Sequence, residues 1–225
     1  MPIRITPLVN GQFYHVFNRG VARQPISFRK FDSRYFTTAF SYYRHQNLPF
    51  QLAKFWRTSV QERRSIIESL EKSNQKLVTV ISYVIMPNHF HLLLRQEVDG
   101  GISEYMSLIT NSYTRFINTK YNRVGSLFQG AFKAKLIETD EQMIHLSRYI
   151  HLNPYTSFVV KDKQQLWIYP WSSLPVYIND TPSWIATTEI FTFFRAREAY
   201  KNFIEDQADY NRQMQLIKYL CFEEM

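Results

Sequence analysis

Cysteine is almost absent from this chain of 225 residues, in which Cys221 is the only one. A single cysteine excludes an intrachain disulfide and a zinc site built from cysteine ligands. Long apolar runs are also missing: no stretch approaches the roughly 18 residues that a membrane-spanning helix needs. The opening residues, MPIRITPLVNGQFYHVFNRG, lack the apolar core of a signal peptide. These absences suit a reducing compartment, so we expect a cytoplasmic protein with no membrane partner.

Internal repeats and low-complexity tracts are absent as well, whereas aromatic and basic residues are abundant. The chain has 15 Tyr and 18 Phe, a formal net charge of +8 and a pI near 9.5. Lysine and arginine neutralise phosphates, and flat rings stack on unpaired bases, so this composition favours a polyanionic partner. Charge alone leaves open a basic protein with no such partner.

The spacing of apolar residues predicts an α+β fold. Strands are expected at residues 11–20, 76–86, 89–95 and 131–138. Helices are expected from Ser33 to about His45, from Ser59 to Asn74, from Ile102 to about Lys120, and from a cap at Thr139 to Asn153-Pro154. The order is β-α-β-β-α-β with one extra helix, which is a ferredoxin-like arrangement with an antiparallel sheet and helices on one face. A last helix is expected around Glu198 to Leu216.

Two histidines interrupt the apolar stretch VIMPNHFHLLLR. Side chains alternate along a strand, so His89 and His91 share one face and can converge on one ion or phosphate. Imidazole suits Zn, Mn, Ni or Fe better than Mg, and two ligands would leave coordination positions open for a substrate oxygen. The alternative is a pair of half-buried strand histidines that are hydrogen-bonded to their neighbours.

The stretch LSRYIHLNP provides a possible nucleophile. His145, Tyr149 and Asn153 follow each other at intervals of four residues and lie on one face of the capped helix. A phenol can attack a phosphodiester if a metal polarises the phosphoryl group, and the Asn153 carbonyl could complete the metal shell. The adjoining apolar face, which we expect to pack on the sheet, consists of Met143, Leu146 and Ile150. The alternative is that Tyr149 is one more core or rim aromatic.

Taken together, FYHVFNRG, VIMPNHFHLLL, SLFQGAFKAKLI and RYIHLNP resemble the single-tyrosine HUH transposases of IS200-like elements and the REP-associated tyrosine transposases. The resemblance covers residues 10–178, including YPWSS, as one catalytic domain with a helical insertion at about 46–75. Residues 179–225 remain as a C-terminal extension without a counterpart.

The resemblance implies a site and a reaction. It implies metal ligands at His89 and His91, a third ligand at Asn153 and a nucleophile at Tyr149, with Mg²⁺ or Mn²⁺ as the cofactor. The implied substrate is single-stranded DNA with a short hairpin, which is cut through a 5′-phosphotyrosine intermediate. In some relatives two subunits exchange the tyrosine helix, so a homodimer is possible.

Basic residues near the expected strand ends are candidate DNA contacts. On the strand AFKAKLI, Lys133 and Lys135 point away from the apolar face, and the loops contribute Arg19, Arg23, Lys120 and Arg123. Tyr121 and Phe128 could stack on bases. The alternative for each is a solvated charge or a core ring.

Three functions follow, in order of preference. The first is a metal-dependent strand transferase that acts through Tyr149. The second is a domesticated hairpin-DNA-binding protein with a regulatory role. The third is a metal-dependent nuclease in which water attacks the phosphate in place of Tyr149.

Overall fold

A four-stranded antiparallel sheet forms the centre of the molecule in a computed structural model that describes residues 7–179 and 181–214. Cys221 and Leu216 therefore lie outside the described residues. The strands follow the order β2-β3-β1-β4, where each pair of neighbours is antiparallel. Their bounds are Phe13–Arg19 for β1, Val78–Ile85 for β2, His89–Gln96 for β3 and Lys133–Ile137 for β4. The α+β class and the antiparallel sheet are as predicted.

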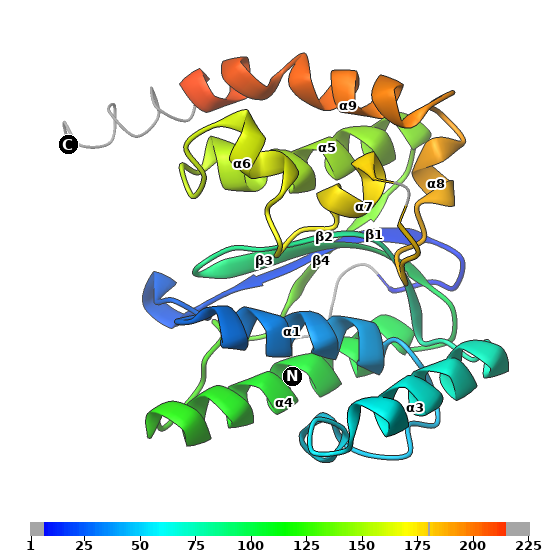
Figure 1. The fold of residues 1–225 in the computed structure, drawn as a ribbon, viewed down its shortest axis with the longest axis vertical. Coiled ribbons are helices and arrows are strands. Elements are labelled where there is room, and N and C mark those ends of the chain that lie inside the picture. Colours follow the sequence, from blue (N-terminus) through cyan, green and yellow to red (C-terminus); the bar gives the residue numbers. More distant parts are fainter. Residues whose placement is uncertain (1–6, 180, 215–225) are drawn as a thin grey trace.

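One layer of helices packs below the sheet in the view of Figure 1. It consists of α1 (Lys30–Tyr43) and α4 (Gly101–Tyr121), with α2 (Leu52–Phe55) and α3 (Val60–Ser73) further out. Phe36 of α1 stacks on Tyr113 of α4 with the ring centroids 4.0 Å apart. The helix predicted between Ser59 and Asn74 is confirmed. Ser59 caps it with Glu62 in a reciprocal capping box, and Asn74 ends it at a φ of 50°.

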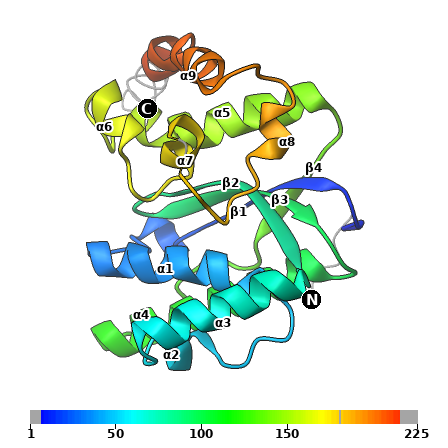
Figure 2. The ribbon, with the colours of Figure 1, turned by 45° about the vertical axis from the view of Figure 1, so that its right-hand side comes forward.

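A second helical layer covers the opposite face of the sheet (Figures 1 and 2). It contains α5 (Asp140–Thr156), α6 (Lys163–Trp167), α7 (Leu174–Ile178), α8 (Thr188–Phe191) and α9 (Arg197–Glu205). The expectation of helices on one face therefore holds for α1 to α4 and fails for α5. The physical reason lies in β2, whose residues are all buried, because a strand that is apolar on both sides needs a cover on both sides.

Helix α5 continues past the point where the sequence predicts its end. It runs to Thr156 with Pro154 inside it, so the prediction that it ends near Asn153-Pro154 is wrong. Proline has no N–H to donate to the carbonyl of residue 150, so the helix loses one hydrogen bond here. Burial of the segment from Ile150 to Thr156 outweighs that loss. The longer helix keeps Asn153 buried inside α5, one turn beyond Tyr149.

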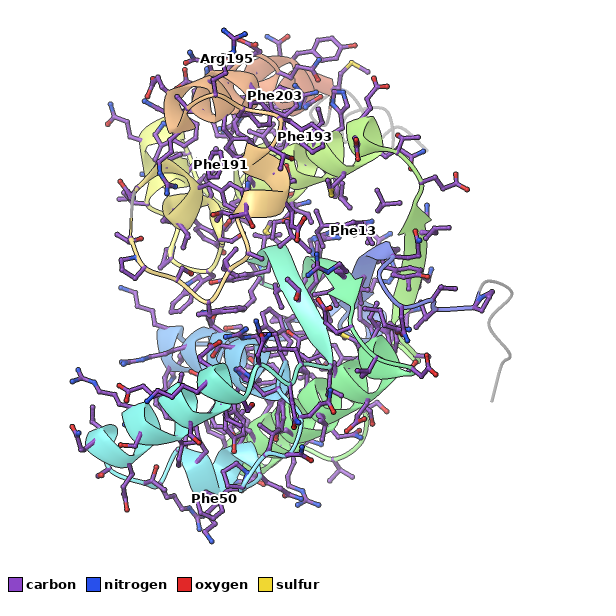
Figure 3. All side chains as sticks on the ribbon, turned by 90° about the vertical axis from the view of Figure 1, so that its right-hand side faces the viewer. Phe13, Phe50, Phe191, Phe193, Arg195 and Phe203 are labelled. Carbon is purple, nitrogen blue, oxygen red and sulfur yellow. The ribbon has the colours of Figure 1, made fainter. Side chains whose placement is uncertain are left out.

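The YPWSS segment, residues 169–173, lies along the outer edge of β2. The Ile85 N–H donates to the Trp171 carbonyl at 2.8 Å, and the Ser173 N–H donates to the Tyr83 carbonyl at 3.0 Å. The chain then reaches α8 and α9, and Figure 3 shows Phe191 and Phe203 packed within this upper layer. The helix predicted from Glu198 begins at Arg197 and is interrupted by a turn at residues 206–207.

Within the residues that the structure describes, no helix combines the length and the apolar character that would let it cross a membrane.

Candidate active site

The site lies on the face of the sheet that α5 covers. Along β1 the side chains of Tyr14 and Val16 are buried towards α1 and α4, so the alternate residues, His15 and Phe17, point to the α5 side. In the register of β1 and β3, Phe17 pairs with His91. Paired residues project from the same face, so three of the six histidines of the chain come together beneath one helix: His15, His89 and His91.

His15 is the residue that sequence reasoning missed. Its Nε2 lies 2.9 Å from Nδ1 of His91, and the two rings stack at a centroid distance of 5.1 Å. Burial, reinforced by the charge of Lys135, lowers the pKa of His15 to about 4. The strand FYHVFNR contained the signal, since its alternation places His15 and Phe17 on one face. The pairing register with β3, which brings that face to His91, was not visible in the sequence.

Tyr149 projects from α5 onto the histidines. Its ring meets that of His91 edge-on at 5.3 Å and that of His15 at 6.2 Å, while 46% of the residue stays exposed to solvent. The Asn153 side chain lies beside both Tyr149 and His89. Burial raises the pKa of the Tyr149 phenol, and the neighbouring Asn153 side chain opposes that rise. The structure thus brings together the four residues that the sequence singled out from two distant segments.

The chemistry of these side chains fits a divalent metal. Nδ1 of His89 lies 2.7 Å from the Asn88 side-chain oxygen, and Nδ1 of His91 faces His15, so each imidazole keeps its Nε2 for another partner. Burial lowers the pKa of both imidazoles, which favours the neutral form that binds metals. Across residues 7–179 and 181–214, no three His, Cys, Asp or Glu side chains are grouped to hold an ion. The donor set would therefore be two imidazoles and the Asn153 amide.

The two histidines of α5, His145 and His151, point away from this site. His145 bonds Arg148 at 2.7 Å and packs against Phe203 of α9. His151 is fully buried, with Tyr200 at 2.7 Å and Ser173 at 2.8 Å from its two ring nitrogens. Burial lowers the pKa of His151 to about 3, so this ring remains a neutral link between α5, α9 and the YPWSS segment.

Five of the six predicted DNA contacts surround the site. Lys133 and Lys135 pair in register with Phe17 and His15, so these lysines share the face of the histidines. Arg19 ends β1 opposite His89 in register. Arg23 lies in the short 3-10 turn that follows β1, and the Arg123 guanidinium donates to Gln24 just after that turn, at 2.8 Å.

Lys120 lies in the other layer, at the end of α4. Its ammonium group donates to the buried carboxylate of Asp32, which also accepts a bond from the Tyr121 hydroxyl at 2.7 Å. The prediction that Phe128 stacks on a base is wrong, because its ring is 6% exposed and packs against Phe90. An apolar residue at the end of a basic loop can serve either as a stacking surface or as an anchor in the core, and here it is an anchor.

Two comparisons with known proteins found a match to this chain. A family model described as "Transposase IS200 like" matches residues 30–153, which include both histidines of β3, Tyr149 and Asn153. The fold resembles a solved structure of the REP-associated tyrosine transposase bound to a REP hairpin. The TM-score is 0.53 at 14% sequence identity, over 79% of this chain and 86% of that one. No curated protein matches the sequence.

Proposed function

The chain belongs to the IS200-like transposase family, since the family model spans residues 30–153 of its 225, and we propose that it is a metal-dependent endonuclease and strand transferase for single-stranded DNA with a hairpin. One observation carries this proposal. The half-exposed Tyr149 lies against His91, and the Asn153 side chain lies beside both Tyr149 and His89. A nucleophile and a set of neutral nitrogen and amide donors thereby meet at one point that solvent can reach.

The proposed reaction has two balanced steps. The Tyr149 oxygen attacks the phosphorus of a phosphodiester, a new P–O bond to tyrosine forms, and the bond from phosphorus to the 3′ oxygen breaks. The phenol loses its proton, and the departing 3′ oxygen gains one to become a hydroxyl. In the second step the 3′-hydroxyl of another strand attacks the tyrosine ester and restores a phosphodiester. The phenol then regains its proton, so rejoining needs no external energy source.

A divalent cation held by His89, His91 and Asn153, Mg²⁺ or Mn²⁺, would polarise the phosphoryl group and offset its charge. The protein's own contribution is positional. Asn153 is 4% exposed within the last turn of α5, which places its amide beside the Tyr149 side chain and the histidines. Asn88 and His15 fix the ring orientations of His89 and His91 from outside.

Basic side chains around the site supply the electrostatic attraction for DNA. Lys133 and Lys135 are exposed on the histidine face, and Arg19 and Arg23 are exposed beyond the end of β1. None of these four side chains forms a salt bridge with a described carboxylate. The likeness to a hairpin-bound transposase supports a hairpin as the structured part of the substrate.

A single chain supplies both halves of the proposed site, because Tyr149 contacts the histidines of its own β3. We therefore propose that the chain is competent without exchange of α5 between subunits. Mixing a Tyr149→Phe variant with a His89→Ala, His91→Ala variant tests this point. Exchange between subunits would restore activity in the mixture, whereas a site built within one chain leaves it inactive.

The covalent adduct is the direct test of the function. Wild-type protein incubated with hairpin-tipped single-stranded DNA from the region that flanks its gene, with Mg²⁺ or Mn²⁺, should give a protein–DNA band that survives denaturation. Tyr149→Phe should abolish the band, and Tyr210→Phe, which alters an exposed tyrosine on the far helical segment, should retain it. Absence of a band from the wild type with either metal would refute the strand-transfer reaction on that DNA.

The same experiment decides between this mechanism and hydrolysis. Burial raises the pKa of Tyr149 and so disfavours the phenolate. This one effect favours water over Tyr149 as the nucleophile. Cleavage that survives in Tyr149→Phe without an adduct would establish the hydrolytic route. If the wild type binds the hairpin but does not cleave it, the chain is a binding protein.

A further inference from the structure

A wide groove runs along the helical layer on the side of the sheet opposite Tyr149. It lies between α1, α2 and α4 and has a volume of about 1360 Å³. Four cationic side chains line it, and no aspartate or glutamate does; the cations are Arg57, Arg63, Arg115 and Lys120. The outward surface of α4 adds serine, threonine and asparagine side chains, which can donate hydrogen bonds to phosphate oxygens.

Two of the cations are available to a ligand. Arg57 and Arg115 are exposed, and neither forms a hydrogen bond or an ion pair through its side chain with any residue that the structure describes. Lys120 is partly neutralised by the buried Asp32. Arg63 donates to the Trp56 and Thr58 carbonyls and keeps its full charge at the rim.

An exposed aromatic surface accompanies these cations. The Phe31 residue is 49% exposed and stacks on Trp56 at 5.8 Å with an interplanar angle of 15°. Lys120 lies 5.0 Å from the centre of the Phe31 ring. The indole nitrogen of Trp56 is buried without a hydrogen-bond partner in the described part of the chain. An exposed ring in a groove that also contains the unpaired Arg57 and Arg115 is a combination that can hold single-stranded nucleic acid, because bases stack on the ring while cations hold the phosphates.

One loop links the groove to the end of β1, beside the candidate active site. Residues 126–128 and 130 of that loop line the groove, and Gln129 accepts a bond from the Arg19 side chain. Arg19 is paired in register with His89. A strand that leaves the site at the end of β1 would thus pass an exposed arginine and a short loop before it reached Phe31.

We infer that this groove binds a single-stranded segment of the DNA substrate that extends beyond the catalytic site. The inference rests on the proposed function, because that function supplies the single strand. It adds a second contact, reached only by strands long enough to pass around the sheet from Tyr149 to Phe31. Binding of long strands should therefore depend on the groove, whereas binding of short strands should not.

The test compares strand lengths on the full chain. Fluorescence anisotropy would measure the affinity for oligothymidylates of about 6 and about 20 nucleotides, one near the lower end of the usual site sizes of single-strand grooves and one beyond their upper end. The groove variant is Arg57→Glu, Arg115→Glu. The control is Arg34→Glu, Arg64→Glu, which makes the same change of charge at two exposed arginines of α1 and α3 outside the groove lining.

The groove variant should bind the long strand about tenfold or more weakly than the control does. The slope of the logarithm of its binding constant against the logarithm of the salt concentration should be shallower by about 1.4, which corresponds to two lost phosphate contacts on a single strand. Phe31→Ala should also weaken long-strand binding. Binding of the short strand and the yield of covalent adduct on short substrates should match the control.

Two results would overturn the inference. Equal long-strand affinity in the groove variant and the control would show that the groove does not hold the strand. An equal loss for both lengths would show a general effect of charge in place of a local contact. Failure of the proposed function is recognised separately, since it appears as the absence of the Tyr149 adduct from the wild type whatever the groove variant does.

Discussion

Nε2 of His15 and Nδ1 of His91 lie 2.9 Å apart, so a single proton is shared between the two rings. If His91 is to bind a metal through its Nε2, the proton belongs on Nδ1 of His91 and His15 must be the acceptor. The neutral His15 ring then carries its own proton on Nδ1. A second histidine thus sets the tautomer and the ring orientation of the first from outside the proposed metal shell, which makes His15 a positioning residue.

Replacing His15 by phenylalanine should weaken Mn²⁺ binding by about 10- to 100-fold, the usual cost of losing the outer partner of a ligating histidine. His15→Gln retains a side-chain oxygen that can accept the bond and should restore much of the affinity. Titration of Mn²⁺ followed by electron paramagnetic resonance measures this without any DNA. Full affinity in His15→Phe would show that the contact is only packing.

The two lysines of β4 should hold DNA phosphates beside Tyr149. Lys133→Glu, Lys135→Glu should weaken binding of single-stranded DNA and lower its log–log salt slope by about 1.4, because two phosphate contacts are lost. Anisotropy at several salt concentrations measures both quantities. The charge-matched control is Lys72→Glu, Lys161→Glu, two exposed lysines away from the sheet face. If both pairs have the same effect, the position of the β4 lysines is irrelevant.

Asp32 should be important for stability. Burial alone would raise its pKa, yet bonds from Lys120, Tyr121 and the N–H groups of Phe28 and Arg29 together hold that pKa below its usual value. Asp32→Asn should lower the free energy of unfolding by about 3 kcal/mol, because the bonds from Lys120, Tyr121 and the two N–H groups lose their charged acceptor.

Lys120→Met should cost less, since the tyrosine and two backbone donors would still satisfy Asp32. Urea denaturation measures both variants. If Lys120→Met weakened DNA binding and left stability unchanged, Lys120 would be a DNA contact rather than a structural partner.

Stability should fall in mild acid, partly through His45. The residue is 1% exposed, and burial, with the charges of Arg44 and Lys76, lowers the pKa of its imidazole to about 4. In the unfolded chain the pKa returns to about 6.5, so between these values the unfolded state binds the proton and the folded state does not. The contribution of His45 is complete above pH 6.5 and is lost as the pH falls towards 4.

Replacing His45 by leucine should remove close to one proton from this dependence, which is about 1.4 kcal/mol for each pH unit within the window. Urea denaturation at intervals from pH 7 to pH 4 would show a shallower decline than in the wild type. An identical slope in the two proteins would mean that His45 is protonated in the folded state, as its 3.6 Å approach to Glu71 would permit.

The sequence was most informative where one local rule decides the structure. Alternation placed His89 and His91 on one face, and the cap at Thr139 placed the start of the tyrosine helix, where the Gln142 N–H donates to the Thr139 hydroxyl at 3.1 Å. The helix from Ser59 to Asn74 was predictable for the same reason, because its capping box and its left-handed end lie within the segment itself.

It was least informative where partners come from distant segments. The link from His15 to His91 depends on a strand register across 76 residues, and the salt bridge of Lys120 depends on Asp32 in another helix. Pro154 shows a different limit. A local rule predicts a helix end there, but the burial of α5 against the sheet and α9 overrides it.

The sheet has two outer strands, and the chain treats them differently. The edge of β2 is paired with the YPWSS segment, whereas the edge of β4 pairs with no further described strand. An open strand edge invites pairing with another molecule, and lysines on a short edge strand are a common protection against it. Lys133 and Lys135 would therefore serve solubility as well as DNA binding. Replacing both lysines by neutral residues should therefore leave a protein that aggregates, whereas replacing them by glutamate keeps a charged edge and should not.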